Sequence, residues 1–237
     1  MFLLGATLAM GFALSAYMIS TAMVRMRQQH TLRVKGLSEA NVHSDIASWT
    51  CSYCFRGTNL PEVYAGLERT RGAVLGFLTD QQVPESEISP NPAGIEVLYT
   101  RDAEGNQTNI IEGYVLRASV SIHSGDVARV QRLAREASRL IRDGYEVEAG
   151  SPQYVYSKLE SVKLDLLAKA TQNAYERAQT LATNSNSAVG RLISGSQGVF
   201  QVTSPDSQEI SDYGSFDTTS IDKSVKCVVT LEFAVQQ

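Results

Sequence analysis

The sequence predicts an α+β protein in which an N-terminal transmembrane helix precedes a domain of antiparallel sheets with three helices. Three observations support this prediction. The first 24 residues carry no charge, several stretches alternate apolar and polar residues as half-buried strands do, and three longer stretches show the apolar period of a helix. The predicted order is β-β-α-β-β-α-β-α-β-β, in which hairpins mix with crossover helices. We expect two intertwined lobes.

Residues 1–27 form the predicted membrane anchor, and residues 28–237 form the predicted soluble domain. Met1 to Val24 carry no charged side chain, and Arg25 and Arg27 follow directly. As a helix, these 24 residues extend about 36 Å, which suffices for a hydrocarbon core of about 30 Å. The alternative is a cleaved signal peptide with a site at Ser20-Thr21-Ala22, although the cationic start typical of such peptides is missing.

Small residues recur along this segment at spacings of three or four and define one helical face. They are Gly5, Ala9, Ala13, Ala16 and Ser20. Small faces let helices approach closely in lipid, so we expect this face to contribute to oligomerisation. The sequence leaves open on which side of the membrane the soluble domain lies. The positive-inside rule would keep the cations of residues 25–35 in the cytoplasm, whereas the family resemblance given below implies a periplasmic domain.

The charge distribution separates a basic juxtamembrane segment from an acidic body. The chain has 21 Lys and Arg against 25 Asp and Glu, which gives a net charge of −4. Residues 25–35 contribute +4, so residues 36–237 carry −8. An acidic body disfavours nucleic acid as a partner, whereas the juxtamembrane cations favour anionic lipid head groups.

The domain begins with two predicted strands and a helix. The strands are expected at residues 31–36 and 45–56, with Ser38 to Ser44 turning between them. Asn59 can cap a helix that runs to about Asp80, with Pro61 in its first turn. Its inward side chains are predicted to be Val63, Leu67, Val74, Phe77 and Leu78.

A hairpin and a second helix come next. The strand from Ile95 to Arg101 leads into a turn at residues 102–106. The return strand has one apolar face, formed by Tyr114, Leu116, Ala118, Val120 and Ile122. Ser124 is the predicted cap of a helix that ends at Gly144. Its apolar stripe is Val127, Val130, Ala134, Ala137 and Ile141.

The last third of the chain combines an extended segment, a long helix and two strands. Residues 145–156 are extended, and the helix spans about 157–184. Its inner seam is predicted to be Leu159, Val162, Leu166, Ala170, Ala174, Ala178 and Leu181. Strands at residues 189–203 and 224–235 follow. The polar stretch Ser204 to Lys223 between them is a predicted surface loop and a candidate interaction site.

Three cysteines are too few for a disulfide framework. Cys51 and Cys54 lie on a predicted strand, where residues three apart face opposite sides. The pair therefore differs from the CxxC that opens a helix in redox enzymes, and a second pair for zinc is missing. Cys227 lies in a late strand, and the sequence leaves open whether it forms a disulfide with Cys51 or Cys54.

We recognise no catalytic constellation in the sequence and expect a protein that is not an enzyme and needs no cofactor or metal. The histidines are dispersed at His30, His43 and His123. His123 with Asp126 comes nearest to an acid–base pair but is more simply a helix-capping region. Glu146 and Glu148 share one strand face, as ordinary surface carboxylates do.

Several local signatures, in this order, resemble the SIMPL-domain family of bacterial envelope proteins over residues 31–236. The matching stretches are Val34-Lys35-Gly36, Ile88 through Pro90 to Tyr99, Glu112-Gly113-Tyr114, the alanines Ala168, Ala174, Ala178 and Ala182, and Val189-Gly190-Arg191-Leu192. The resemblance implies export to the periplasm and ring-like or channel-like oligomers. It supplies no catalytic residues. The chain departs from the family pattern in its long uncharged anchor and in Cys51 and Cys54.

Together these observations predict a single-pass protein of the bacterial inner membrane with its domain in the periplasm. We expect it to self-assemble into a ring- or cage-like homo-oligomer that organises or protects the envelope under stress. Its partners are then further copies of itself and the lipid bilayer. The alternative is an accessory subunit that docks on another membrane protein through Ser204–Lys223 or the anchor. Redox sensing through Cys51 and Cys54 is a more distant reading.

Overall fold

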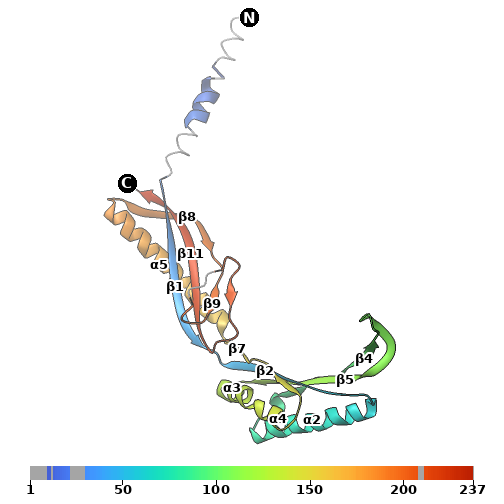
Figure 1. The fold of residues 1–237 in the computed structure, drawn as a ribbon. Helices are drawn as coiled ribbons and strands as arrows, with labels where there is room; N and C mark the ends of the chain where they lie inside the picture. Colours follow the sequence, from blue (N-terminus) through green and yellow to red (C-terminus); the bar gives the residue numbers. More distant parts are fainter. Residues whose placement is uncertain (1–9, 12, 22–29, 208–210, 237) are drawn as a thin grey trace, which may run out of the picture.

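Two lobes, each with its own sheet and core, make up the domain in the computed structural model (Figure 1). The structure describes residues 10–11, 13–21, 30–207 and 211–236. Both ends of the described domain form one lobe, here called the terminal lobe. The middle of the chain forms the other, the inserted lobe. The mixed α+β architecture predicted from the sequence is confirmed.

Most of the predicted anchor lies outside the described residues, and so do Gly5 and Ala9. Residues 10–11 and 13–21 are helical, which places Ala13, Ala16 and Ser20 on a helix. Within the described part of the chain, no helix is both long enough and apolar enough to cross a membrane.

The elements of the terminal lobe come from two distant parts of the sequence. They are β1 (Thr31–His43), α5 (Leu159–Asn184), β8 (Ala188–Gln197), β9 (Gln201–Thr203), β10 (Ser215–Phe216) and β11 (Asp222–Gln236). Strands β1 and β11 pair antiparallel over the whole length of β1, and α5 packs against both (Figure 1). The prediction of one strand at residues 189–203 is wrong. The chain forms β8 and β9 there, both of which pair with β11.

The turn predicted at Ser38 to Ser44 is mostly strand, because β1 continues to His43. Its polar residues find partners on both faces of the sheet. The Ser38 hydroxyl donates to the carbonyl of Leu166 in α5 at 2.6 Å, and Glu39 accepts a hydrogen bond from the Ser224 hydroxyl. Tertiary pairing thus overrides the turn propensity of these residues.

The long helix approaches β1 through small residues. Five residues at spacings of four form its buried seam: Leu166, Ala170, Ala174, Ala178 and Ala182. Leu181, predicted to point inward, is about half exposed at 52%. On the strand side, a Cβ on Gly36 would overlap the Ala170 carbonyl oxygen and lie 2.7 Å from the Ala174 nitrogen. Only glycine therefore allows this approach.

The same helix covers the outer edge of β1. The Asn173 side chain accepts a hydrogen bond from the Leu37 amide at 3.2 Å, and the Arg177 guanidinium donates to the Lys35 carbonyl at 3.2 Å. Side chains of α5 thus satisfy backbone groups that would otherwise offer a template for a further strand.

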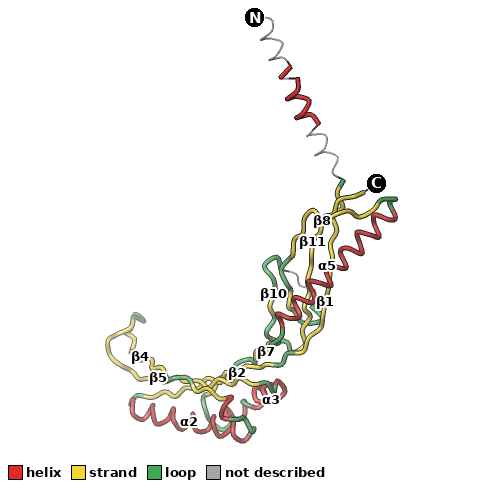
Figure 2. Tube along the Cα trace, turned by 180° about the vertical axis from the view of Figure 1, so that it is seen from behind, coloured by secondary structure: helices red, strands yellow, loops and turns green. Residues whose placement is uncertain are grey.

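The inserted lobe places its helices on one face of its sheet (Figure 2). Its elements are β2 (Ile46–Gly57), α2 (Leu60–Asp80), the 3-10 turn η1 (Glu85–Glu87), β3 (Ile88–Pro90), β4 (Gly94–Arg101), β5 (Gln107–Ser124), α3 (Val127–Glu136), α4 (Ser138–Arg142), β6 (Val147–Ala149) and β7 (Gln153–Val155). The strand order is β3-β5-β2-β6, with β4 beside β5 and β7 beside β2. The predicted cap of α2 is confirmed, because the Asn59 side chain accepts from the Glu62 amide.

The helical region after β5 differs from its prediction in three respects. Ser124 belongs to β5, and Asp126 caps α3 by accepting from the Arg129 amide at 2.9 Å. The helix is interrupted at Ala137, so α3 and α4 are separate. Ile141 is 56% exposed, because Leu133 and Leu140 occupy the core instead. Gly144, at φ +91°, ends the region as predicted.

A small hydrogen-bonded junction joins the two lobes. The Asp45 carboxylate accepts from the Ser157 amide at 2.7 Å and from the Ser157 hydroxyl at 2.6 Å. The Ser44 amide donates to the Ile221 carbonyl, and the Tyr154 amide donates to the Thr218 carbonyl. Both chain crossings and the segment before β11 therefore meet at one place, which sets how the lobes sit on each other.

Buried Lys223, in β11 of the terminal lobe, fixes the segment that leads from the junction into β11. Its ammonium group donates to the carbonyls of Asp217 and Ser220, both at 2.6 Å. Burial lowers the pKa of Lys223, and the charge of Asp217 opposes that shift. The stretch Ser204 to Lys223 is therefore not simply a surface loop, since it includes β10 and ends inside β11.

Replacing Gly36 by Ala should lower the free energy of unfolding by about 2 kcal/mol, because the new methyl group forces α5 away from β1. Chemical denaturation followed by circular dichroism measures this change. Gly72→Ala is the matched control: a Cβ there meets nothing within 4 Å, so helix propensity should make it neutral or stabilising. Equal effects of the two substitutions would contradict the proposed close contact.

The Asp45–Ser157 contact should give the stability a specific pH dependence. The hydrogen bond from the Ser157 hydroxyl is the main cause that lowers the pKa of Asp45. The ionised Asp45 carboxylate therefore contributes its full stabilisation to the folded state above the pKa of about 3.9 that it has in the unfolded chain. This stabilisation disappears as the pH falls through the lower pKa of the folded state. Asp45→Asn should cost about 1 kcal/mol at pH 7 and nearly nothing at pH 2.

Urea unfolding at both pH values checks this prediction, with Asp80→Asn as a control at an exposed aspartate. A cost that stays the same at pH 2 would show that the charge of Asp45 is not what stabilises the junction.

Candidate functional site

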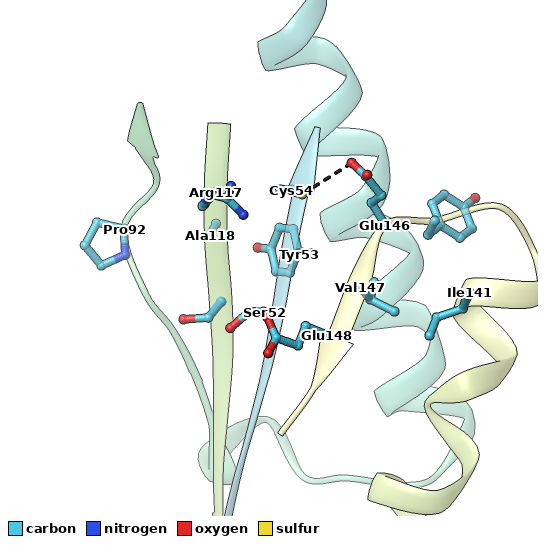
Figure 3. A pocket seen from close by; sticks show the side chains of 12 residues that line it. Ser52, Tyr53, Cys54, Pro92, Arg117, Ala118, Ile141, Glu146, Val147 and Glu148 are labelled. Atoms are coloured by element: carbon cyan, nitrogen blue, oxygen red, sulfur yellow. Dashed lines mark hydrogen bonds between the residues drawn. The ribbon is translucent and has the colours of Figure 1, made fainter. Parts of the chain in front are cut away.

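A groove of about 500 Å³ lies beside β2, β5 and β6 of the inserted lobe (Figure 3). Its polar side comes from the open face of the sheet, opposite to the helices. The register of the strands brings Cys54 opposite Arg117 and aligns Ser52 with Ser119 and Glu148. The groove thus combines a thiol, hydroxyls and charges of both signs.

Cys54 and Glu146 form the central contact of the groove. The thiol donates to a carboxylate oxygen of Glu146 at 3.3 Å, shown as the dashed line in Figure 3. Arg56 pairs with the same carboxylate through two contacts of 2.8 and 3.2 Å. Glu146 is therefore already engaged on both oxygens.

The environment keeps the Cys54 thiol protonated. Burial raises the pKa of Cys54, and the hydrogen bond to Glu146 and its negative charge raise it further. A reactive cysteine needs the opposite, namely a thiolate stabilised by cations or a helix N-terminus. The thiol in this groove is therefore a poor nucleophile.

The two cysteines of the CxxC motif face opposite sides of β2, as predicted. Cys51 is fully buried in the core of the inserted lobe, where burial raises its pKa to about 11. Cys227 is buried in the core of the other lobe. All three cysteines are free, and the separate cores explain why Cys227 pairs with neither of the others.

The histidines singled out in the sequence do not converge on a site, whereas the carboxylates Glu146 and Glu148 both line the groove. His43 is paired with Asp222 at 2.7 Å on the surface of the terminal lobe. His123 is exposed, and Asp126 serves as the cap of α3. Among the described residues, no group of three or more potential ligands is placed to hold a metal ion.

Sequence reasoning missed an exposed apolar surface on the β4–β5 hairpin, which projects beyond α2 at the far end of the inserted lobe (Figures 1 and 2). We call it the hairpin surface, and it consists of Ile95, Tyr99, Ile110 and Ile111 with the acidic side chains Glu104 and Glu112. Ile110 is 63% exposed and Ile95 is 55% exposed. The signal in the sequence was the adjacent pair Ile110-Ile111. A strand with one solvated face normally alternates apolar and polar residues, so two isoleucines in succession place one of them on each face.

A second missed feature is a stripe of arginines on α3 and α4. We call it the arginine surface, and it consists of Arg132, Arg135, Arg139 and Arg142 beside exposed Ile141. Arg132 and Arg135 lie three residues apart on α3, and Arg139 and Arg142 lie three residues apart on α4, so each pair shares a face of its own helix. Arg139 pairs with Glu136, whereas within the described chain no carboxylate lies within ion-pair distance of Arg132, Arg135 or Arg142.

Comparison with known families identifies the chain. The sequence model of the SIMPL family, described as a protein of unknown function (DUF541), matches residues 32–233. The match covers nearly all of both lobes, so the chain belongs to the SIMPL family. A search of curated proteins returned no match.

The Cys54 environment predicts a slow thiol that Glu146 controls. Glu146→Gln removes the carboxylate charge and leaves Arg56 unpaired, so the pKa of Cys54 should fall. We expect alkylation of Cys54 by iodoacetamide at pH 8 to become several-fold faster, measured by mass spectrometry of the native protein.

Two comparisons make this test specific. Cys51 and Cys227 should stay unlabelled in both proteins because they are buried. Glu148→Gln, a change in the same groove at a carboxylate that does not contact Cys54, should leave the rate unchanged. A faster rate in both variants would show that the effect comes from loosened structure.

Proposed function

We propose that this protein is a non-enzymatic, membrane-anchored envelope protein that self-assembles into a ring- or cage-like homo-oligomer. The observation that carries the proposal is the hairpin surface, where large apolar side chains are exposed on a hairpin that extends from the body of the lobe (Figure 2). Exposed apolar patches of this kind mark interaction sites in soluble domains. The family to which the chain belongs adds no enzymatic activity to this picture.

The open edge of β4 supports assembly through the same region. Strand β4 pairs only with β5, so its other edge has no strand beside it within the described chain. The corresponding edge of β1 is covered by Asn173 and Arg177. The edge of β1 is thus covered, whereas the edge of β4 is open and lies beside exposed isoleucines. The edge of β4 is therefore the one suited to bind a partner.

The N-terminal segment supports membrane attachment. Its described helical part exposes large apolar side chains, namely Met10, Leu14, Tyr17, Met18 and Ile19. Together with the uncharged sequence up to Val24, this favours insertion into lipid, with the small-residue face at Ala13, Ala16 and Ser20 available for helix association. We place the protein in the bacterial inner membrane with its domain in the periplasm, acting in envelope organisation or stress protection.

A second candidate function is that of an accessory subunit docked on another membrane protein. One observation favours it: Tyr213, in the stretch Ser204 to Lys223, is 97% exposed. Tyrosine is enriched at protein interfaces because it combines a large apolar ring with a polar end. Co-purification of a stoichiometric partner that is lost in Tyr213→Ala would support this reading.

The self-assembly proposal predicts a closed particle of many subunits for the full-length protein in non-ionic detergent. Light scattering gives its mass, and particle imaging gives its shape. A mass of one subunit at micromolar protein concentration would contradict the proposal. It would also direct attention to the docking surface around Tyr213.

A further inference from the structure

Opposite charges occupy two separate surfaces of the inserted lobe. Residues 94–113, which include the hairpin surface, contain four acidic residues and one arginine, a net charge of −3. Residues 127–142, which include the arginine surface, contain five arginines and one glutamate, a net charge of +4. This basic segment is unusual in a domain that is acidic as a whole.

Most of these charges are not neutralised within the chain. Of the five arginines, Arg129 pairs with Glu87 and Arg139 pairs with Glu136. Arg132, Arg135 and Arg142 are exposed, and no carboxylate of the described chain lies within ion-pair distance of them. On the hairpin, Glu104 and Glu112 are likewise exposed and lack a cationic partner within that part of the structure.

The two surfaces cannot meet within one molecule. Helix α3 lies at the end of the inserted lobe near the junction, whereas the tip of the β4–β5 hairpin lies at the opposite end (Figures 1 and 2). Any contact between them therefore joins different molecules, head to tail. Such a contact is heterologous, and it closes into a ring when the rotation between neighbours permits.

We infer that the hairpin surface of one copy docks on the arginine surface of the next copy. This inference rests on the proposed self-assembly and names the two surfaces that carry it. Tyr99 and Ile111, which lie opposite each other in the hairpin register, supply exposed apolar side chains, and exposed Ile141 adjoins Arg142 in the sequence of the neighbour. Glu104 and Glu112 lie at the rim opposite Arg132, Arg135 and Arg142. An apolar centre with a charged rim is the usual composition of a specific protein interface.

A lipid surface fits the arrangement less well than a second copy does. Anionic head groups would attract the arginine surface but repel the acidic hairpin, which carries the exposed isoleucines. Another copy of the chain, by contrast, offers each surface a surface of opposite charge with exposed apolar side chains.

Charge reversal with complementation tests the inference in the full-length protein in non-ionic detergent. The first variant carries R132E, R135E and R142E, and the second carries E104R and E112R. Each variant alone should lose the large particle, with association at least about tenfold weaker than in the wild type. An equimolar mixture should restore it, because each reversed surface then meets a surface of opposite charge.

Light scattering and sedimentation measure mass for each sample at 50 mM and 500 mM NaCl. High salt should weaken the wild-type particle and the mixture alike, since exposed charges are screened. Arg191→Glu, at an exposed arginine of β8 in the terminal lobe, is the matched control and should assemble like the wild type. Circular dichroism confirms that each variant is folded.

The outcomes separate this inference from the proposed function. A wild-type particle that persists in both charge variants overturns the docking surfaces while self-assembly stands. Loss in each variant without recovery in the mixture overturns the pairing of the two surfaces. A monomeric wild type overturns both proposals. Binding of that monomer to anionic vesicles, lost in the arginine variant alone, would assign the arginine surface to lipid.

Discussion

The close approach of α5 to β1 at Gly36 is the contact on which the rest of the domain depends. It is possible because glycine faces a helix seam made largely of alanine. Two distant parts of the chain, β1 and α5, are thereby held in one lobe, and β11 completes it. Everything between them is an insertion whose two ends must emerge side by side, and the junction at Asp45 and Ser157 is where they do so.

The inserted lobe uses its two sheet faces differently. Its helices fill one face with apolar side chains, and the other face carries the partly buried Ser52 and Cys54 and the exposed Arg117. The groove on this open face lacks an activated nucleophile, because burial and then the neighbouring Glu146 raise the pKa of Cys54, and Glu146 is itself neutralised by Arg56. Surface complementarity at the two ends of the lobe is the stronger indication of function.

The proposed assembly also accounts for features that would be costly in an isolated domain. An unpaired strand edge beside exposed isoleucines invites uncontrolled aggregation. Acidic side chains at the tip of the hairpin limit such contacts to surfaces of opposite charge, and the arginine stripe of α3 and α4 is such a surface. Charge would then select the partner, while the apolar side chains provide most of the favourable free energy.

The sequence alone determined the class of fold, the family and the local elements with clear periodicity. The alternation of β5 and β11, the cap at Asn59 and the opposite directions of Cys51 and Cys54 all follow from short-range rules. Long-range pairing decided the rest. Ser38 and Glu39 belong to a strand because β11 and α5 supply their hydrogen bonds. Ile141 and Leu181 are exposed because the helical faces that pack on the sheets differ slightly from the faces predicted from the sequence. The two charged surfaces were visible as residues but not as a pair, since only the tertiary structure places them at opposite ends of one lobe.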